Sequence, residues 1–179
     1  MRCEVAPLLH LDDGFDLRPA GADDAALIAA WMARPHILPW WQQDWPVSQW
    51  AEELSRFAAG EHTIPCMTVF EGVELAYVEL YRVRHDRLAE YYAWQEHDWG
   101  LHLAIGDTAF VGRGIGRRLI RSLADALLRF DPLCDRVVAE PDVLNVPSVR
   151  AFEAAGFVRQ EELELPEKRA QLMMRGREA

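Results

Sequence analysis

Hydrophobic and polar residues alternate along one short stretch in the middle of the chain. Between residues 100 and 105, leucine and isoleucine alternate with glycine, histidine and alanine, which puts the two sets on opposite faces of a predicted strand. From Ile115 to Leu128 the apolar residues recur at helical spacing, which predicts a helix whose apolar stripe packs against a sheet. The sequence V-G-R-G-I-G at 111–116 joins the two elements.

This glycine-rich junction has the composition of an anion site. Glycines let backbone N–H groups approach phosphate oxygens, and the helix start adds positive potential. Residues 112–129 carry five arginines and one aspartate, a net charge of +4. A tight connection with a solvated arginine face is the alternative. Leu119 stands where a dinucleotide fingerprint needs its third glycine, and no G-K-[ST] follows, so neither a Rossmann nor a Walker loop fits.

The rest of the pattern predicts a mixed α/β domain over residues 15–179, after an N-terminal extension at 1–14. Asp23 or Asp24 is expected to cap the first helix, and Asn145 with Pro147 begins the last. The sheet is expected to have six to seven strands flanked by about four helices. Besides the central strand and helix, strands are predicted at 15–19, 64–70, 73–83, 136–140, 157–165 and 169–175, and helices at about 25–31, 47–59 and 145–155.

Two predicted connections are rich in aromatic residues. The first, H-I-L-P-W-W at 36–41 followed by Trp45 and Trp50, holds four of the seven tryptophans. It either packs the second helix onto the sheet or forms an aromatic wall for a substrate or acyl chain. The second, 84–98, contains Tyr91 and is long for a compact domain, which favours a lid or a mobile segment.

The net charge and the cysteine content limit which classes of binding partner and cross-link are expected. The 179 residues include 29 acidic and 19 basic side chains, a net charge of −10. This charge disfavours nucleic acid and membrane surfaces and favours a cationic small molecule. Cys3, Cys66 and Cys134 are far apart and the six histidines are scattered, so neither a disulfide framework nor a metal is expected. No apolar run reaches 18 residues and no secretion signal is recognisable, so we expect a cytoplasmic monomer or homodimer.

The order of elements, the glycine loop and R-V-V-A-E-P-D-V-L-N-V-P-S-V-R-A-F-E-A-A-G-F at 136–157 together resemble the GNAT superfamily of acyl-CoA-dependent N-acyltransferases. The resemblance implies a single-domain GNAT fold with acetyl-CoA or another acyl-CoA as co-substrate. The loop would bind the pyrophosphate of coenzyme A, and the strand before it would pair with the pantetheine arm. The later helix would line the other side of the cofactor. The residues implied are Leu103, Ala104, Val111, Gly112, Arg113, Gly114, Ile115, Gly116, Arg117, Asn145, Ser148 and Phe152.

Two positions depart from the family pattern. Val111 stands where the loop usually begins with Gln or Arg, which removes a side-chain donor and keeps the backbone donors. Phe152 stands where a tyrosine commonly protonates the departing thiolate. Phenylalanine has no proton to give, so the general acid is left open.

Two branches of the superfamily resemble different parts of the chain. The acyltransferases of hydroxamate siderophore assembly, of the mycobactin, aerobactin and desferrioxamine type, carry H-D-x-G-x-H-x-x-I-G, which resembles residues 97–106. The aminoglycoside 6′-N-acetyltransferases resemble residues 36–41 and the helix end before Gly156. That second branch typically has aspartate at the position of His102, so His102 favours the siderophore branch.

N-acylation needs an uncharged nitrogen, and a hydroxylamine is far less basic than an alkylamine, so a histidine suffices as base. His102 is the candidate base, the alternative being a structural strand histidine. Asp142 follows the carboxyl end of a predicted strand and matches an acidic residue of the siderophore branch. We expect Asp142 to orient His102 or hold the cationic end of the substrate, the alternative being turn chemistry after Pro141. A backbone N–H near Leu103 is expected to donate to the oxyanion.

These features predict an acyl-CoA-dependent N-acyltransferase in siderophore biosynthesis. Its substrate would be the terminal amine or N-hydroxyamine of a diamine or basic amino acid, of the N-hydroxycadaverine, N6-hydroxylysine or N5-hydroxyornithine type. An aminoglycoside 6′-N-acetyltransferase and a non-catalytic coenzyme A-binding module are the alternatives. The amine, the acyl group and the carrier of the acyl group stay open. The predicted substrate pocket is lined by His36, Trp40, Trp41 and Tyr91.

Overall fold

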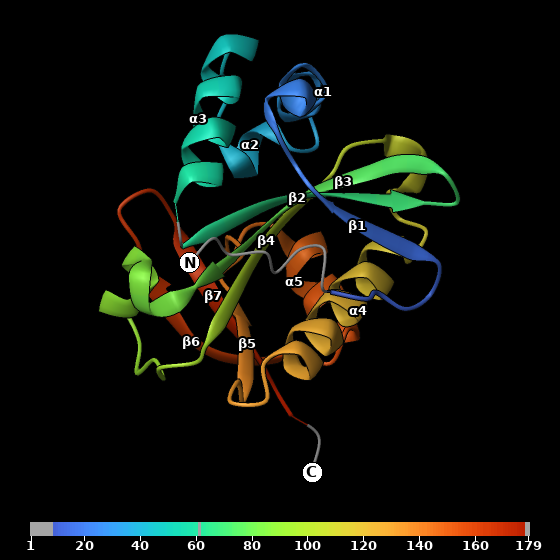
Figure 1. Cartoon of the computed structure of the whole chain (residues 1–179). Helices are drawn as coiled ribbons and strands as arrows, with labels where there is room; N and C mark the ends of the chain where they lie inside the picture. The colour runs from blue at the N-terminus through green and yellow to red at the C-terminus, as the bar shows by residue number, and fades with distance from the viewer. Residues whose placement is uncertain (1–8, 61, 178–179) are drawn as a thin grey trace. The chain divides into compact units, whose positions relative to one another are not determined.

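The computed structural model describes residues 9–60 and 62–177 (Figure 1). The chain divides into two compact units. The described part of the first unit is residues 9–80 without residue 61, together with His102–Val111. The second unit is Tyr81–Leu101 with residues 112–177. Cys3 and residues 1–8 of the predicted N-terminal extension lie outside the described residues.

The first unit packs helices with apolar faces against antiparallel strands. Strand β1 pairs with β2 so that Phe15 lies opposite Phe70 and Pro19 opposite Cys66. Helix α3 contacts both α1 and β2, and the buried Trp50 lies in the core between them. The elements of this unit are β1 (Phe15–Pro19), α1 (Ala25–Met32), α2 (Leu38–Trp41), α3 (Val47–Ala59), β2 (Thr63–Phe70), most of β3 (Val73–Arg82) and the end of β4 (Trp99–Ile105).

The second unit combines one parallel and two antiparallel strand pairs. The start of β4 runs parallel to β5, with Trp99 opposite Val137, and β7 pairs antiparallel with both β5 and β6. Helix α4 contacts α5 and β5, and α5 contacts β6 and β7. Its elements, besides the start of β4, are α4 (Ile115–Phe130), β5 (Arg136–Ala139), α5 (Val146–Ala154), β6 (Val158–Glu164) and β7 (Arg169–Gly176).

The strands follow the order β1-β2-β3-β4 in the first unit and β4-β5-β7-β6 in the second, which makes a seven-stranded mixed sheet. The described residues include five α-helices, of which α2 has only four residues. The predicted fold class, with its order of strands and long helices, is therefore confirmed. The short helix α2 was not predicted, because the prolines at 35 and 39 favour a break in the helix and the tryptophans have no helical period.

Two helix caps are predicted, and they differ in the bonds that their side chains make. Asn145 caps α5, with its Oδ1 accepting from Ser148 N at 3.2 Å. Asp24 makes no side-chain cap bond to α1. Its carboxylate instead accepts from Gly21 N at 2.9 Å and pairs with Arg18 at 2.7 Å. Asp24 is thus the N-cap residue of α1, as one of the two expected candidates, but it makes no cap hydrogen bond, because the ion pair and the short helical turn before α1 take both carboxylate oxygens.

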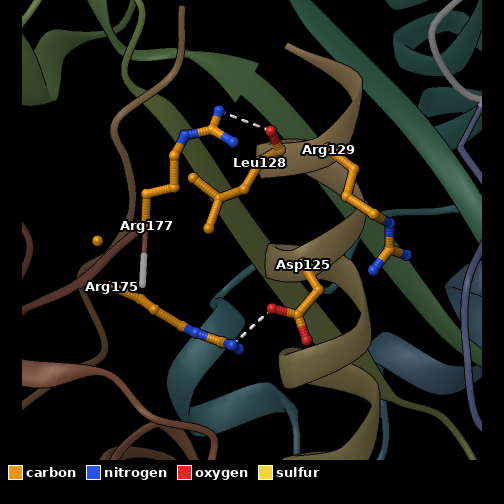
Figure 2. Close-up of a pocket in the computed structure, with 6 residues that line it drawn as sticks. Asp125, Leu128, Arg129, Arg175 and Arg177 are labelled. Carbon is orange, nitrogen blue, oxygen red and sulfur yellow. Dashed lines mark hydrogen bonds and ion pairs between the residues drawn. The ribbon is translucent and has the colours of Figure 1, made fainter. Parts of the chain in front are cut away.

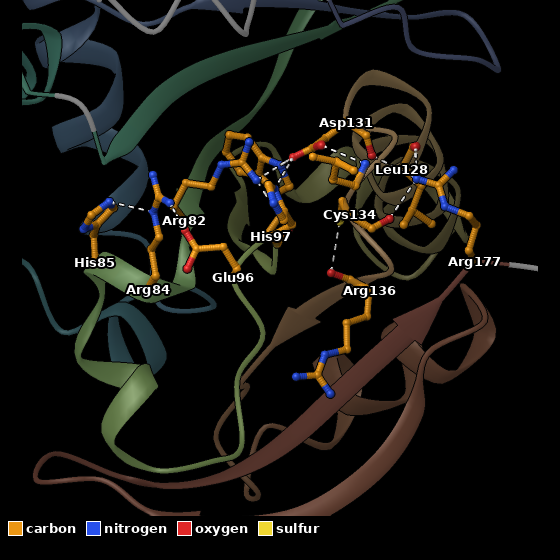
Figure 3. A network of polar contacts seen from close by, with 12 residues as sticks. Arg82, Arg84, His85, Glu96, His97, Leu128, Asp131, Cys134, Arg136 and Arg177 are labelled. Carbon is orange, nitrogen blue, oxygen red and sulfur yellow. Dashed lines mark hydrogen bonds and ion pairs between the residues drawn. The ribbon is translucent and has the colours of Figure 1, made fainter.

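The long connection before β4 is anchored by two polar networks. Asp98, which is 1% exposed, accepts from Arg136 Nε at 2.8 Å and from the Tyr92 hydroxyl at 2.7 Å. Asp131, at the end of α4, pairs with Arg82 at 2.6 Å and lies 3.7 Å from His97 Nδ1 (Figure 3). The end of the segment 84–98, at His97 and Asp98, is thus anchored within the second unit. A lid function for the rest of the segment stays a prediction.

Candidate active site

His102 lies on β4 in the first unit, beside a carboxylate of the neighbouring strand β3. Its Nδ1 is 3.3 Å from Oε2 of Glu79. The side chain of His102 is 32% exposed and that of Glu79 is 14% exposed, so the pair lies at the edge of the core and not within it. A structural strand histidine at the edge of the core is compatible with this position, and the role of His102 as base stays a prediction.

The second carboxylate oxygen of Glu79 has a different partner. The Tyr77 hydroxyl donates to Oε1 of Glu79 at 3.0 Å, and Tyr77 is completely buried. Burial, together with the charge of Glu79, raises the pKa of Tyr77 well above its ordinary value. The hydroxyl therefore keeps its proton and stays a donor. The carboxylate is held from one side by a rigid buried group and meets His102 on the other.

The tryptophan-rich segment packs within the first unit through different residues, and its role as an aromatic wall for a substrate or acyl chain stays a prediction. Trp41 meets the His102 ring edge to face at 6.2 Å and Tyr77 at 5.7 Å. Trp50 is fully buried and packs on Tyr77 and Trp45. Trp50 thus packs helix α3, whereas Trp41 lies beside the ring of His102. Trp40, the other predicted pocket tryptophan, is 36% exposed.

His36 is bound to the backbone at the end of β4. Its Nε2 lies 2.9 Å from the carbonyl oxygen of Ile105, and Arg34 donates to the carbonyl of Gly106 at 2.6 Å. A carbonyl only accepts, so Nε2 of His36 carries the proton. Two side chains from the segment after α1 therefore fix the end of the strand that carries His102. A contact of His36 with substrate stays a prediction.

The glycine loop contains two glycines in the left-handed backbone conformation. Gly112 and Gly114 have φ of +74° and +78°, a conformation that favours glycine. A Cβ added to Gly112 would meet no atom within 4 Å, so the loop is open there. Gly114 is the N-cap of α4, whose first N–H groups have no acceptor within the helix. A helix start of this kind suits an anion, and binding of the acyl-CoA pyrophosphate by residues 112–117, with Arg113 and Arg117 supplying charge, stays a prediction.

The other residues expected near the acyl-CoA are divided between the two units. Leu103, Ala104 and Val111 lie in the first unit, with Ala104 buried and Val111 44% exposed. Asn145 and Ser148 are engaged with each other at the start of α5 in the second unit.

Phe152 is a core residue of the second unit. It is 3% exposed and packs edge to face on Phe157, with ring centroids 5.1 Å apart. Its ring stabilises the packing of α5, so the tyrosine of the family pattern is replaced here by an apolar contact. Its predicted part in binding the acyl-CoA stays a prediction.

Asp142 lies in the second unit, in a turn after β5. Its Oδ1 accepts from Leu144 N at 2.8 Å, and its backbone bridges to Ala170. The turn role considered for Asp142 is therefore present. A role in orienting His102 stays a prediction, and Glu79 is the carboxylate beside His102 within the first unit.

Glu79 is the residue that sequence reasoning missed. A usable signal exists in A-Y-V-E-L-Y at 76–81, because residues i and i+2 of a strand share a face and Tyr77 and Glu79 are two apart. A charged residue inside an otherwise apolar strand needs a hydrogen-bond or ion-pair partner, because burying an unpaired charge is costly. Tyr91, a predicted pocket residue, is half-buried in the second unit and packs on a cluster that includes Tyr81 and Leu88.

A separate pocket in the second unit is structural. Figure 2 shows Arg175 directed at Asp125 and Arg177 directed at the carbonyl of Leu128, at 2.5 and 2.7 Å. These arginines tie β7 and the residue after it, Arg177, to α4. Among residues 9–60 and 62–177, no group of three or more His, Cys, Asp or Glu side chains could hold a metal ion. The residues that line the pocket are Asp125, Leu128, Arg129, Arg175, Gly176 and Arg177.

A mixed sheet, a glycine loop leading into α4 and a histidine on the strand before that loop define a GNAT-type acyltransferase. The sequence model of the Acetyltransferase (GNAT) domain family matches residues 21–165, so the chain belongs to this family. The relatives found by sequence are named as acyltransferases of lysine, of hydroxylated amines and of aminoglycosides. Within the part of the chain that the structure covers, no helix is both long enough and apolar enough to span a membrane.

Three similar proteins bear on the reaction. The lysine N-acyltransferase MbtK of Mycolicibacterium paratuberculosis is 39% identical over 150 residues, covering 84% of this chain and 68% of MbtK. The N(6)-hydroxylysine O-acetyltransferase of Escherichia coli is 29% identical over 86% of this chain, which spans 49% of that enzyme. The structure of AAC(6′)-Ib with paromomycin and acetyl-CoA superposes with a TM-score of 0.83 at 25% identity, covering 92% of this chain and 94% of that one.

Proposed function

We propose that the chain transfers an acyl group from an acyl-CoA to the terminal amine or N-hydroxyamine of a diamine or basic amino acid in hydroxamate siderophore biosynthesis. The observation that carries the proposal is the half-exposed His102 on β4, with Trp41 as an aromatic wall and Glu79 at 3.3 Å. The names of MbtK and of the E. coli enzyme support lysine and N6-hydroxylysine as types of acceptor. Because the chain spans only part of each relative, the substrate belongs to the proposal.

In the proposed reaction, His102 takes the proton from the attacking nitrogen. The nitrogen forms a bond to the thioester carbonyl carbon, and the oxyanion accepts from a backbone N–H near Leu103. The carbon–sulfur bond then breaks, and the proton removed from nitrogen is balanced by one that ends on the thiolate sulfur. An N-hydroxyamine is already neutral near pH 7, so a histidine base is strong enough.

The acyl-CoA would be held by the backbone of residues 112–116 with Arg113 and Arg117. Asp142 is proposed to bind the cationic end of the acceptor, in keeping with the net charge of −10. Tyr91 and His36 belong to the same proposal as pocket residues. A cytoplasmic location and a monomeric or dimeric state stay predictions.

The test is release of free thiol from acetyl-CoA and succinyl-CoA. The acceptors are N-hydroxycadaverine, N6-hydroxylysine, N5-hydroxyornithine, lysine and kanamycin, assayed side by side. We expect turnover with lysine or a hydroxylated amine to exceed turnover with kanamycin, and His102→Ala to lose at least about 100-fold in kcat/KM because a general base contributes that much. Turnover with kanamycin alone would contradict the proposal.

Aminoglycoside acetylation is the second candidate. It is favoured by the close fit to AAC(6′)-Ib, whose structure contains an aminoglycoside. A third outcome, a thermal shift with coenzyme A and no thiol release with any acceptor, would instead support a coenzyme A-binding module.

A further inference from the structure

The two oxygens of the Glu79 carboxylate have different partners. Oε1 accepts from the buried Tyr77 hydroxyl at 3.0 Å, and Oε2 lies 3.3 Å from Nδ1 of His102. The three side chains come from two adjacent strands, β3 and β4. The polar contacts thus run from the buried Tyr77 through Glu79 to His102, the candidate base.

We propose that Glu79 is a positioning residue for acyl transfer. It accepts a hydrogen bond from Nδ1–H of His102 and so leaves Nε2 as the nitrogen that takes the proton of the substrate. The inference rests on the proposed role of His102 as base. It assigns a function to Glu79, which makes no bond to substrate itself.

The tautomer follows from the chemistry of the contact. A carboxylate oxygen only accepts, so the imidazole nitrogen that faces it carries the proton. In a neutral imidazole the other nitrogen then holds the lone pair. The distance of 3.3 Å is long for a hydrogen bond, and such contacts often shorten when substrate binds. Glu79 therefore selects Nε2 for the chemistry.

Charge and rigidity make the same carboxylate useful after proton transfer. The imidazolium that forms is positive, and Glu79 lies beside it with a side chain only 14% exposed. In a site of low dielectric, a fixed negative charge stabilises such a cation more than water does. Tyr77 keeps the carboxylate from rotating away, and Trp41 packs against both His102 and Tyr77. The ring is thus confined on two sides.

The decisive variant is Glu79→Gln, which keeps the shape and removes the charge. A glutamine offers both an oxygen and an NH₂ group, so it no longer dictates which imidazole nitrogen is protonated. We expect kcat with the best acceptor to fall by about 100-fold, because loss of an orienting carboxylate beside a catalytic histidine has effects of that order or larger. KM for the acyl-CoA should not change. Glu79→Asp, which restores the charge at a shorter reach, should recover part of kcat.

Glu74→Gln is the matched control. Glu74 is on the same strand, carries the same charge and pairs with Arg18 at 2.7 Å rather than with His102. Its kcat should stay within about 2-fold of the wild type, since surface charges act weakly at a distance. If Glu79→Gln and Glu74→Gln have the same kcat, the positioning role is wrong even though the enzyme acylates its amine.

The tautomer can also be measured without turnover. ¹⁵N NMR of the neutral imidazole at about pH 8.5 distinguishes a protonated from an unprotonated ring nitrogen, and the signal that His102→Gln removes identifies His102. We expect protonated Nδ1 in the wild type and in Glu74→Gln, and loss of this preference in Glu79→Gln. A wild-type ring protonated on Nε2 would overturn the inference. If no acceptor is turned over, the proposed function fails and the NMR result alone decides the role of Glu79.

Discussion

Gly100 lies directly against the ring of Tyr81. A Cβ added to Gly100 would be 2.1 Å from Cζ of that ring, and Tyr81 is itself 2% exposed and donates to Glu140 at 2.9 Å. The ring cannot move aside without breaking this buried hydrogen bond. The start of β4 is thus held in place by a contact between a backbone and an aromatic side chain of the second unit.

We predict that Gly100→Ala destabilises the protein by about 2 kcal/mol or more, because overpacking a close-packed core costs of this order. Urea unfolding monitored by tryptophan fluorescence measures the effect. Gly21→Ala is the control, since a Cβ at Gly21 would meet nothing within 4 Å and its φ of −138° suits any residue. Equal stability of Gly100→Ala and Gly21→Ala would show that β4 can shift.

The sequence predicts most of the fold because its elements carry strong periodic signals. The apolar stripe of α4 and the two strands around Gly72 are close to the observed bounds of Ile115–Phe130, Thr63–Phe70 and Val73–Arg82. The short α2 escapes prediction because four residues contain barely one helical turn. Propensity and period do not define so short an element.

The candidate site is harder to predict, because a side chain finds its partners across strands. His102 stands out by its place in a motif. The sequence marks Glu79 only as a charged residue in an apolar strand, and its partner His102 becomes visible once β3 lies beside β4. Asp142 follows a strand end, and that position is equally suited to the turn bond it makes to Leu144. Register between strands therefore decides which carboxylate meets the histidine.

The left-handed glycines of the loop lead to a prediction on acyl-CoA binding. Gly112→Ala should raise KM for the acyl-CoA by about 5- to 10-fold, since a φ of +74° costs an alanine roughly 1–2 kcal/mol. The KM of the amine should stay unchanged in steady-state thiol-release assays. Gly72→Ala is the control: it bears similar strain, at φ +80°, in the turn between β2 and β3. A rise in KM for acyl-CoA in both variants would point to general destabilisation.

The described cysteines are predicted to be unreactive. Burial raises the pKa of Cys134 to about 11 and raises that of Cys66 further, and only the thiolate reacts readily. In a Cys3→Ser background, native protein at pH 8 should react slowly with Ellman's reagent. The two remaining thiols should react at once in denaturant. Rapid labelling of the folded variant would show that one of these two sites opens in solution.

The ion pair between Arg18 and Asp24 makes the free energy of unfolding depend on pH in the acid range. The hydrogen bond from Arg18 lowers the pKa of Asp24 below its ordinary value of 3.8, against an opposing effect of burial. A carboxyl whose pKa is lower in the folded state than in the unfolded state stabilises the fold when the pH is above its ordinary pKa. This contribution is lost as the pH falls through the folded-state pKa. Arg18→Met should therefore cost about 0.5 kcal/mol at pH 7, a value kept small because the arginine is 41% exposed. Urea unfolding of the wild type and the variant should converge as the pH falls through the folded-state pKa of Asp24 and the carboxyl becomes protonated in both states. A difference that stays constant between pH 7 and pH 2.5 would instead assign the loss to the packing of the arginine stem.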